Sequence, residues 1–262
     1  MALIENTLFG IDDKVANAIS IMKQYEPIEG YNLGFSGGKD SVVIKALADI
    51  AKIKYTAVYN VTTVDPPELV RFIKYNFTDV IWSRAKLSFL KMLVKKKCPP
   101  LRHRRWCCEL YKEKKQKGTT TIVGVRWEES ARRRSKWKIY NIFGRPKTVV
   151  ICPIVDWNEA DVWEFIEGNS LKYCSLYDEG FSRLGCVFCP MTSAGQKRKE
   201  RLRWPVLEAA FRKAFYDIWE VKPCYDLWNN AEEYFEWWMG DKSSRKEDIS
   251  LFEKYYKSKE GV

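Results

Sequence analysis

The stretch YNLGFSGGKDSVVIKALADIAKIKYTAVYNV, residues 31–61, decides the fold. It opens with the short apolar run YNLGF, which is typical of a buried strand. SVVIKALADIAK then places apolar residues at helical spacing, and YTAVYNV is rich in the β-branched and aromatic residues that favour strands. A strand, a helix and a second strand in this order predict a parallel βαβ unit.

Helix and strand signals continue to alternate on both sides of this unit. The residues at helical spacing predict helices over 11–22, 67–77, 86–96 and from Asn158 onward. Strands are predicted near 79–82 and at 119–125 and 148–153. We therefore predict an α/β fold with a doubly wound, mainly parallel sheet.

The character of the chain changes near residue 190. Segments such as RLRWPVLEAAFRKAFYDIWE, residues 201–220, are helical, charged and rich in Trp, and strand signals are absent from them. We predict an α/β domain over 1–190, which includes the paired cysteines described below, and a helical C-terminal appendage over 191–262.

Composition limits the class of protein. With 262 residues and 46% hydrophobic side chains, the chain can bury a substantial core. No run approaches the roughly 18 apolar residues that span a bilayer, and the first residues do not resemble a signal peptide, so we expect a cytoplasmic protein without a membrane partner. The net charge of +11 favours partners that carry phosphate, whether a nucleotide or a nucleic acid.

The string SGGKDS at 36–41 lies between the first strand and the helix of the βαβ unit. Backbone N–H groups and a helix N-terminus converge on an anion at such a turn, and glycine lets the main chain approach a phosphate closely. A lysine adds a point charge, and an aspartate can help to hold Mg²⁺. The alternative is an ordinary glycine-rich turn. The candidate nucleotide-binding residues here are Ser36, Gly37, Gly38, Lys39, Asp40 and Ser41.

A second candidate element, GVRWEESARRR at 124–134, follows the strand predicted at 119–125. Arg126 and Arg133 offer forked donors that bind phosphate or sulfate, and Ser130 adds a hydroxyl. The alternative is a solvated basic face of a helix. Because ligands bind at the carboxyl edge of the strands in α/β sheets, the position of the element favours a binding role.

Four cysteines are paired along the chain. Cys107 and Cys108 are adjacent, and Cys186 and Cys189 form a CxxC. Four thiolates suit either a [4Fe-4S] cluster or a structural zinc ion. Because adjacent cysteines converge poorly on one tetrahedral ion, the pattern favours the cluster.

Several segments together resemble a known family. SGGKDS resembles the PP-loop of N-type ATP pyrophosphatases and their relatives, which include tRNA-thiolating enzymes and PAPS reductases. VTTVDPPELVRFI at 61–73, GVRWEESARRR, and PIVDWNEADVWEFI followed by LYDEGFSRLGC resemble further segments of this family, in the expected order across 30–192. The resemblance implies an adenine nucleotide alpha-hydrolase-like fold that binds an adenine nucleotide. In the second element it implies a binding role for Gly124, Arg126, Glu129, Ser130 and Arg133.

The cysteine pattern resembles that of the cluster-bearing PAPS reductases. WCCELYKEKK and RLGCVFCP look like the two halves of their Cys-Cys…Cys-x-x-Cys pattern. This resemblance implies that Cys107, Cys108, Cys186 and Cys189 ligate a [4Fe-4S] cluster. Cys174 lies close enough along the chain to compete as a ligand or to act as a reactive thiol. The remaining cysteines, Cys98, Cys152 and Cys224, are expected to be structural.

These features predict an enzyme of sulfur metabolism. Because the loop is intact, which suits ATP, we expect ATP with Mg²⁺ to be attacked at its α-phosphate, with loss of pyrophosphate and sulfur transfer to a nucleic-acid or protein acceptor. Lys39, Asp40 and Cys174 are the candidate catalytic residues.

Two alternatives stay open. The first is an APS or PAPS reductase that releases sulfite. Since LFEKYYKSKEGV at 251–262 lacks the cysteine that such reductases use, its nucleophile would be Cys174, Cys224 or a partner's thiol. The second alternative is a nucleic-acid-binding module without turnover, which the basic run at 102–105 favours.

Overall fold

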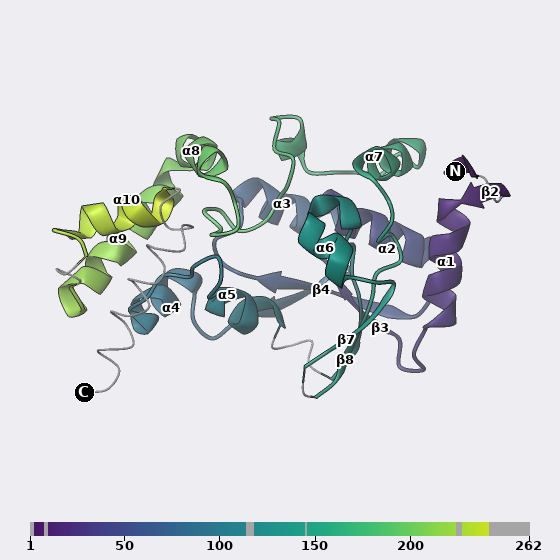
Figure 1. Ribbon diagram of the computed structural model, residues 1–262, viewed down its shortest axis with the longest axis horizontal. Helices are drawn as coiled ribbons and strands as arrows, with labels where there is room; N and C mark the ends of the chain where they lie inside the picture. The colour runs from purple at the N-terminus through teal and green to yellow at the C-terminus, as the bar shows by residue number, and fades with distance from the viewer. Residues whose placement is uncertain (1–2, 8–9, 114–117, 145, 224–226, 241–262) are drawn as a thin grey trace. The chain divides into compact units, whose positions relative to one another are not determined.

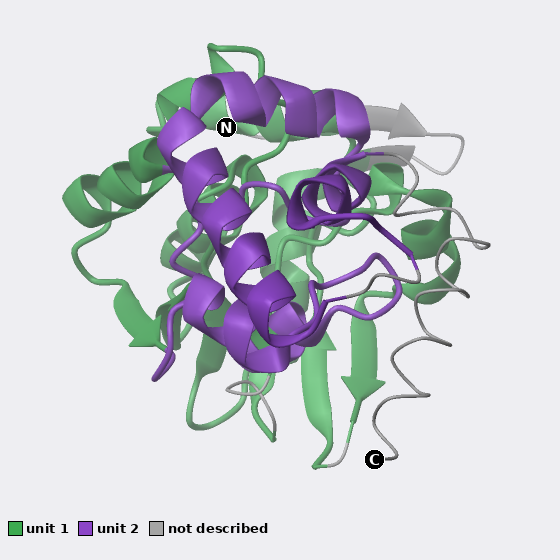
Figure 2. Cartoon of the chain, turned by 90° about the vertical axis from the view of Figure 1, so that its left-hand side faces the viewer, with its two compact units in different colours: residues 1–61, 67–84, 111–185 green, residues 62–66, 85–110, 186–262 purple. Residues whose placement is uncertain are grey.

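The computed structural model describes residues 3–7, 10–113, 118–144, 146–223 and 227–240. The chain divides into two compact units, each made of segments that are separate in sequence (Figure 2). Unit 1 comprises residues 1–61, 67–84 and 111–185, and unit 2 comprises 62–66, 85–110 and 186–262. The domain boundary proposed at residue 190 stays a prediction. One change of unit falls nearby, between Gly185 and Cys186.

Unit 1 is built on a six-stranded sheet with the strand order β5-β4-β3-β6-β8-β7. All neighbours pair in parallel except β7, which is antiparallel to β8. The strands are β3 (Tyr31–Gly34), β4 (Tyr55–Val61), β5 (Ile81–Arg84), β6 (Thr120–Ile122), β7 (Tyr140–Phe143) and β8 (Thr148–Ile151). The mainly parallel α/β fold is confirmed.

The predicted βαβ unit is present as β3, helix α2 (Lys39–Ala51) and β4, and Figure 1 shows α2 beside these strands. Tyr31 lies opposite Tyr55, and the parallel register continues to Gly34 and Val58. Val43, Ile44, Leu47 and Ala48 of α2 are fully buried, because their helical spacing places them on the side that packs against the rest of the unit, whereas Ile50 is exposed. The strand therefore delivers the SGGKDS turn directly to the start of a well-anchored helix.

Further helices complete unit 1. They are α1 (Lys14–Gln24), α3 (Pro67–Asn76), α6 (Ala131–Lys136) and α7 (Glu159–Gly168), together with the short helices η1 (Glu109–Glu113, which begins in unit 2), η3 (Trp127–Glu129) and η4 (Ser175–Tyr177). Helices α1 and α7 contact α2. Asn158 caps α7 as predicted, and its side chain accepts from the Asp161 amide at 2.9 Å.

The N-terminal region differs from the prediction. Strands β1 (Ile4–Thr7) and β2 (Gly10–Asp13) form an antiparallel hairpin where the sequence predicted the first turn of a helix. Asp13 ends the hairpin, and its carboxylate accepts from the Val15 and Ala16 amides at 3.0 Å. Because this cap satisfies the first helical donors, α1 begins at Lys14 rather than at Ile11.

Unit 2 is helical and has an aromatic core. Its helices are α4 (Phe89–Lys96), α5 (Trp106–Cys108), α8 (Ala194–Arg203), α9 (Pro205–Val221) and α10 (Ala231–Met239). Helix α9 contacts α4, α8 and α10. Phe211 and Phe215 of α9 pack on Trp238, whose indole N–H donates to the Pro100 carbonyl at 2.9 Å. The described residues of the C-terminal segment, 191–223 and 227–240, are therefore mainly helical, as predicted, and residues 85–110 belong to the same unit.

Within the described ranges, every helix is too short or too polar to cross a lipid bilayer.

Candidate functional site

The phosphate loop joins β3 to α2 in a conformation that depends on glycine. Gly37 has a φ of +74°, and a Cβ there would lie 2.6 Å from Ile73 and 2.9 Å from Leu69. Gly38 is the N-cap of α2, and a Cβ on it would lie 3.4 Å from the Ser36 and Tyr177 hydroxyls. A side chain at Gly37 would therefore strain the backbone and require the Ile73 and Leu69 side chains of α3 to shift.

The two serines hydrogen-bond to each other across the loop. The Ser41 hydroxyl is buried and donates to the Gly38 carbonyl at 2.8 Å. It accepts from both the backbone N–H and the hydroxyl of Ser36 at 3.2 Å. Ser36 itself is exposed. Ser41 thus fixes the shape of the loop, and Ser36 is the serine that solvent and ligands can reach.

Lys39 is held by three residues that the sequence interpretation missed. Its backbone N–H donates to the Tyr177 hydroxyl at 2.8 Å. Its buried ammonium donates to the Ser182 carbonyl at 3.0 Å and pairs with the Glu159 carboxylate at 3.4 Å. Tyr177 and Ser182 belong to the segment LYDEGFS. Tyr177 is 138 residues from Lys39 in the sequence, and only the fold brings this segment onto the loop.

Asp40 is paired with Arg126, from the second candidate element. The Arg126 Nε atom lies 2.6 Å from Asp40 Oδ1, and its Nη1 atom lies 2.8 Å from Glu128 Oε2. Burial lowers the pKa of this guanidinium, but Asp40 and Glu128 outweigh burial, so the pKa is raised. A Cβ on Gly124 would lie 2.8 Å from the Asp40 carbonyl oxygen. The two candidate elements are therefore in direct contact.

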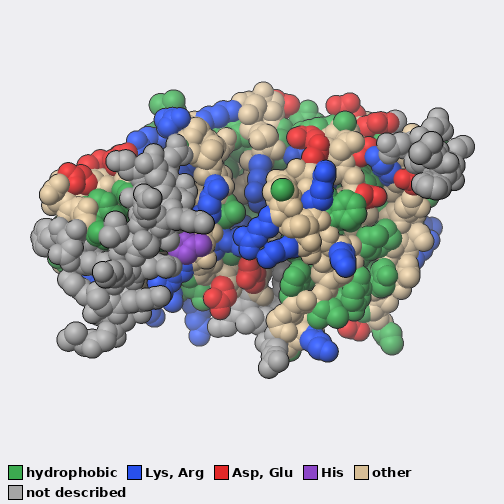
Figure 3. All heavy atoms as spheres, viewed as in Figure 1, with side chains coloured by type: hydrophobic (Ala, Val, Ile, Leu, Met, Phe, Trp, Pro, Cys, Tyr) green, Lys and Arg blue, Asp and Glu red, His purple; other side chains and the backbone are tan. Residues whose placement is uncertain are grey.

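The rest of the second element forms a capped turn. Glu129 accepts from the Arg126 amide at 3.1 Å and pairs with Arg133 at 2.5 Å. Ser130 caps α6 and accepts from the Arg133 amide at 3.2 Å. Both arginines that were predicted to bind phosphate are thus paired with carboxylates here, and their phosphate contact stays a prediction. Figure 3 shows further Lys and Arg side chains among acidic ones on the face in view.

The four paired cysteines all belong to unit 2. Cys107 and Cys108 form the end of α5, and Cys186 and Cys189 precede α8; all four are partly exposed thiols. The pKa of Cys107 is raised, first by a hydrogen bond with Cys108, then by burial and by the charges of Cys108, Cys186 and Cys189. The four thiols are therefore close enough to interact electrostatically. The Arg105 guanidinium donates to the Cys108 sulfur at 3.9 Å.

Backbone contacts shape the loop that carries Cys186 and Cys189. The Val187 amide donates to the Val64 carbonyl at 2.9 Å. Phe188 has a φ of +55°, and its amide donates to the Glu200 carboxylate at 2.7 Å. Glu200 is buried, and burial raises its pKa. The sequence interpretation missed this residue, because a glutamate on a charged helix carries no distinguishing signal.

The donor set fits an iron–sulfur cluster. Among the residues that the structure describes, no three or more His, Cys, Asp and Glu side chains are grouped so as to hold one metal ion. A [4Fe-4S] cluster asks for a different arrangement, since each thiolate binds its own iron atom. Four neighbouring thiols from two segments suit such a cluster by their chemistry, and their role as its ligands stays a prediction.

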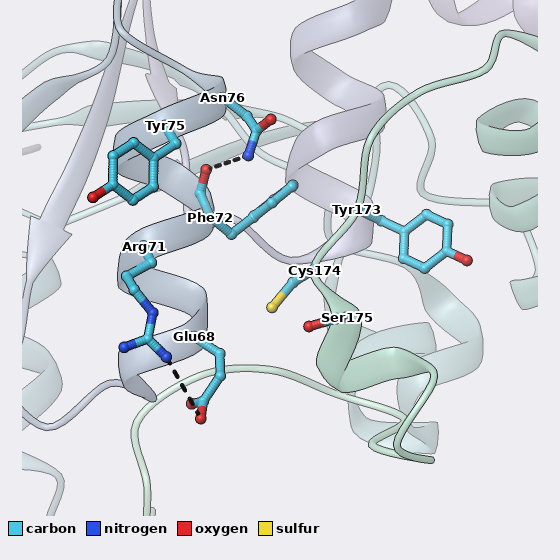
Figure 4. A pocket seen from close by; sticks show the side chains of 8 residues that line it. All are labelled: Glu68, Arg71, Phe72, Tyr75, Asn76, Tyr173, Cys174 and Ser175. Carbon is cyan, nitrogen blue, oxygen red and sulfur yellow. Dashed lines mark hydrogen bonds and ion pairs between the residues drawn. The ribbon is translucent and has the colours of Figure 1, made fainter.

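Cys174 belongs to unit 1, whereas the four paired cysteines belong to unit 2. It is 1% exposed, and burial raises the pKa of its thiol. Figure 4 shows its sulfur directed toward α3, where it lines a pocket of about 410 Å³ with Glu68, Arg71 and Phe72. A buried thiol with a raised pKa is a weak nucleophile. Its predicted role as a ligand or reactive thiol therefore stays untested.

Two of the three cysteines that were expected to be structural lie among the described residues. Cys98 and Cys152 are buried, and burial raises the pKa of Cys152 to about 12. Cys224 lies outside the described residues.

Comparison with known proteins identifies relatives of this chain. An uncharacterised protein of Methanocaldococcus jannaschii is 30% identical over 221 residues, which cover 75% of this chain and 44% of that protein. A second protein of this organism is 33% identical over 190 residues, covering 66% of this chain and 46% of that protein. The chain thus spans less than half the length of these two relatives.

Two proteins with named activities align over most of their own length. An adenosine 5'-phosphosulfate reductase of Bacillus cereus is 25% identical over 218 residues, covering 75% of this chain and 90% of that protein. The crystal structure of a phosphoadenylyl-sulfate reductase from Candida auris superposes with a TM-score of 0.50 at 17% identity, covering 65% of this chain and 88% of that chain. The latter likeness shows a shared fold.

A family profile also matches this chain. The profile of the phosphoadenosine phosphosulfate reductase domain matches residues 30–192, which is more than half of the chain. That span contains the phosphate loop, the element that pairs with it and the four paired cysteines. The chain therefore belongs to the phosphoadenosine phosphosulfate reductase domain family.

Proposed function

We propose that this protein is an enzyme of sulfur metabolism that binds ATP with Mg²⁺ at Ser36–Ser41, releases pyrophosphate and transfers sulfur to an acceptor. The observation that carries this proposal is the intact SGGKDS loop at the start of α2, which the positive φ of Gly37 and the close approach of Gly124 hold in shape. A glycine turn at a helix N-terminus is suited to the phosphates of a nucleotide.

Each loop residue has a defined task in this reaction. The loop amides other than those of Ser36 and Lys39, which donate to Ser41 and Tyr177, bind phosphate oxygens together with the Ser36 hydroxyl. Lys39 neutralises charge that develops on the leaving pyrophosphate. Asp40, oriented by Arg126 at 2.6 Å, ligates Mg²⁺ through its carboxylate. Because Lys39 Nζ donates to Ser182 in this structure, it must turn from that carbonyl to reach a phosphate.

The group transfer takes place in two balanced steps. An acceptor oxygen attacks the α-phosphorus, the bond from phosphorus to the bridging oxygen breaks, and pyrophosphate leaves with the bonding electron pair. A hydrosulfide-level donor then attacks the activated carbon of the acceptor, and AMP leaves with the acceptor oxygen. No oxidant or reductant is consumed in these two steps.

The paired cysteines have the sulfur-handling role in this proposal. Cys107, Cys108, Cys186 and Cys189 would hold a [4Fe-4S] cluster, which when bound supplies a site for sulfur delivery. Arg102, Arg104 and Arg105 are exposed and lie within five residues before Cys107. An exposed basic run at this position suits an acceptor with a phosphate backbone, so a nucleic acid is the preferred acceptor over a protein.

The second candidate function is reduction of APS or PAPS to sulfite. The similarity to the Bacillus cereus adenosine 5'-phosphosulfate reductase favours it. It requires a nucleophilic thiol, and Cys174 is buried with a raised pKa, which disfavours attack on a sulfonucleotide.

Product analysis distinguishes these functions. Protein purified anaerobically is incubated with Mg²⁺, sulfide, dithiothreitol and total RNA in three separate reactions, which contain ATP, APS or PAPS. Pyrophosphate, AMP and sulfite are then measured in each reaction. We expect pyrophosphate and AMP from ATP without sulfite from APS or PAPS. Sulfite from either sulfonucleotide would support the reductase instead, and turnover of none of the three would support a binding module.

A further inference from the structure

Tyr177 lies directly over the phosphate loop. Its hydroxyl accepts the hydrogen bond of the Lys39 amide at 2.8 Å. A Cβ on Gly38 would come within 3.4 Å of the same oxygen. The amide at the start of a helix points toward the position where an anion binds. The Tyr177 oxygen is therefore at the edge of the space that phosphate oxygens would enter.

The hydroxyl has a proton to donate. A phenol oxygen carries one donor hydrogen and accepts through its lone pairs, and the Lys39 amide uses only an accepting position. Within the described part of the chain, no acceptor for the Tyr177 proton is present. Burial raises the pKa of Tyr177, which keeps the hydroxyl protonated near neutral pH. The Tyr177 hydroxyl is thus a donor whose proton is available to a ligand.

The ring is fixed before any ligand arrives. Trp163 of α7 packs edge-on against it with centroids 5.2 Å apart, and Tyr173 packs at 6.4 Å. The Lys39 ammonium lies 5.4 Å from the ring centroid and anchors the following segment through Ser182. Because these contacts hold the ring in place, a ligand that bonds to the hydroxyl does not have to order it.

From this geometry we infer that Tyr177 is a phosphate-binding residue of the nucleotide site. Its hydroxyl continues to accept from the Lys39 amide and donates its proton to a phosphate oxygen. This inference rests on the proposed function only in requiring that the loop binds a nucleotide phosphate. It adds to the glycine loop a side chain that comes from η4.

The test compares two tyrosines of the same segment. In Tyr177→Phe the hydroxyl over the loop is lost. In Tyr173→Phe the lost hydroxyl is one that donates to Asp178 at 3.1 Å, and the packed ring stays. Affinities for Mg²⁺-ATP and for inorganic pyrophosphate are measured by calorimetry on the full chain. A hydrogen bond to a charged group changes affinity by roughly 10-fold to 100-fold, so Tyr177→Phe is expected to weaken both ligands by at least about tenfold. Tyr173→Phe is expected to bind as the unmodified protein does.

The contrary outcomes separate this inference from the proposed function. If the unmodified protein binds ATP and Tyr177→Phe binds it equally well or more tightly, Tyr177 only packs against the loop and the inference is wrong, while the proposed function stands. If the unmodified protein binds neither ATP nor pyrophosphate, both are wrong. Should Tyr177→Phe not fold, 3-fluorotyrosine placed at position 177 gives a second measurement, since its ¹⁹F resonance must shift on addition of pyrophosphate. An unchanged resonance would equally overturn the inference.

Discussion

Replacement of Arg126 by methionine tests the ion pair that joins the two candidate elements. The Arg126 side chain is 4% exposed and pairs with Asp40 at 2.6 Å and with Glu128 at 2.8 Å. It also donates to the Trp157 carbonyl at 3.3 Å. Methionine keeps most of the apolar stem and leaves these acceptors without their donor.

The structure sets the size of the effect. Removal of one partner from a buried ion pair costs about 3–5 kcal/mol. Because the Asp40 side chain is 24% exposed, water can replace part of the lost bonding, so we expect about 3 kcal/mol. Arg133→Met is the matched control, since its pair with Glu129 spans one turn of helix and both side chains are at least 20% exposed. Such a pair contributes only about 0.5 kcal/mol.

Equilibrium urea unfolding, followed by Trp fluorescence, measures both variants. We expect Arg126→Met to lose about 2.5 kcal/mol more unfolding free energy than Arg133→Met. The double variant Asp40→Asn with Arg126→Met should lose less than the sum of its single changes, because each change alone leaves a partner unpaired. Equal losses in Arg126→Met and Arg133→Met would show that the Asp40 pair does not join the elements.

Three further predictions follow from individual contacts. Glu200→Ala removes the acceptor of the Phe188 amide in the CxxC loop, so the protein should retain less iron after anaerobic reconstitution and lose about 2 kcal/mol of unfolding free energy. Iron analysis and urea unfolding measure these two effects, and unchanged values would mean that the loop does not need this acceptor. Gly124→Ala places a Cβ 2.8 Å from a backbone oxygen of Asp40 and should weaken ATP binding or unfold the protein, whereas Gly185→Ala meets nothing within 4 Å and should do neither. Cys152 is 0% exposed and burial raises the pKa of its thiol to about 12, so its alkylation at pH 8, followed by mass spectrometry, should be slow in the folded protein and at least about tenfold faster in urea that unfolds it; equal rates would contradict a buried, protonated thiol.

The sequence predicted the part of the fold around the SGGKDS loop well. The β3-α2-β4 unit follows from strong local patterns, and Asn158 was identified as a cap because its side chain acts within its own turn. Strand β7 was missed, since Tyr140, Ile142 and Phe143 are exposed and show no strict alternation with polar residues. A short exposed strand at the edge of a sheet forms because it pairs with its neighbour, here β8, and the sequence alone does not predict this pairing.

Sequence patterns selected residues for the candidate site but did not identify their partners in the folded chain. Asp40 and Arg126 were both chosen, but their pairing across 86 residues is a property of the folded chain. Local patterns also give no reason to pair Tyr177 with the Lys39 amide or Glu200 with the Phe188 amide. The first contact is distant in sequence, and the second joins a loop to a helix. Propensity and periodicity describe neighbours along the chain, whereas these bonds depend on topology.

The most direct test of the central claim compares two buried lysines of α2. Lys39 begins the helix at the loop, whereas Lys45 pairs with Asp49 and Asp79 and bonds to Tyr55. Equilibrium binding of Mg²⁺-ATP should weaken at least about tenfold in Lys39→Ala and stay unchanged in Lys45→Ala, after circular dichroism shows that both variants are folded. Binding by folded Lys39→Ala with the affinity of the unmodified protein would contradict phosphate recognition at Ser36–Ser41.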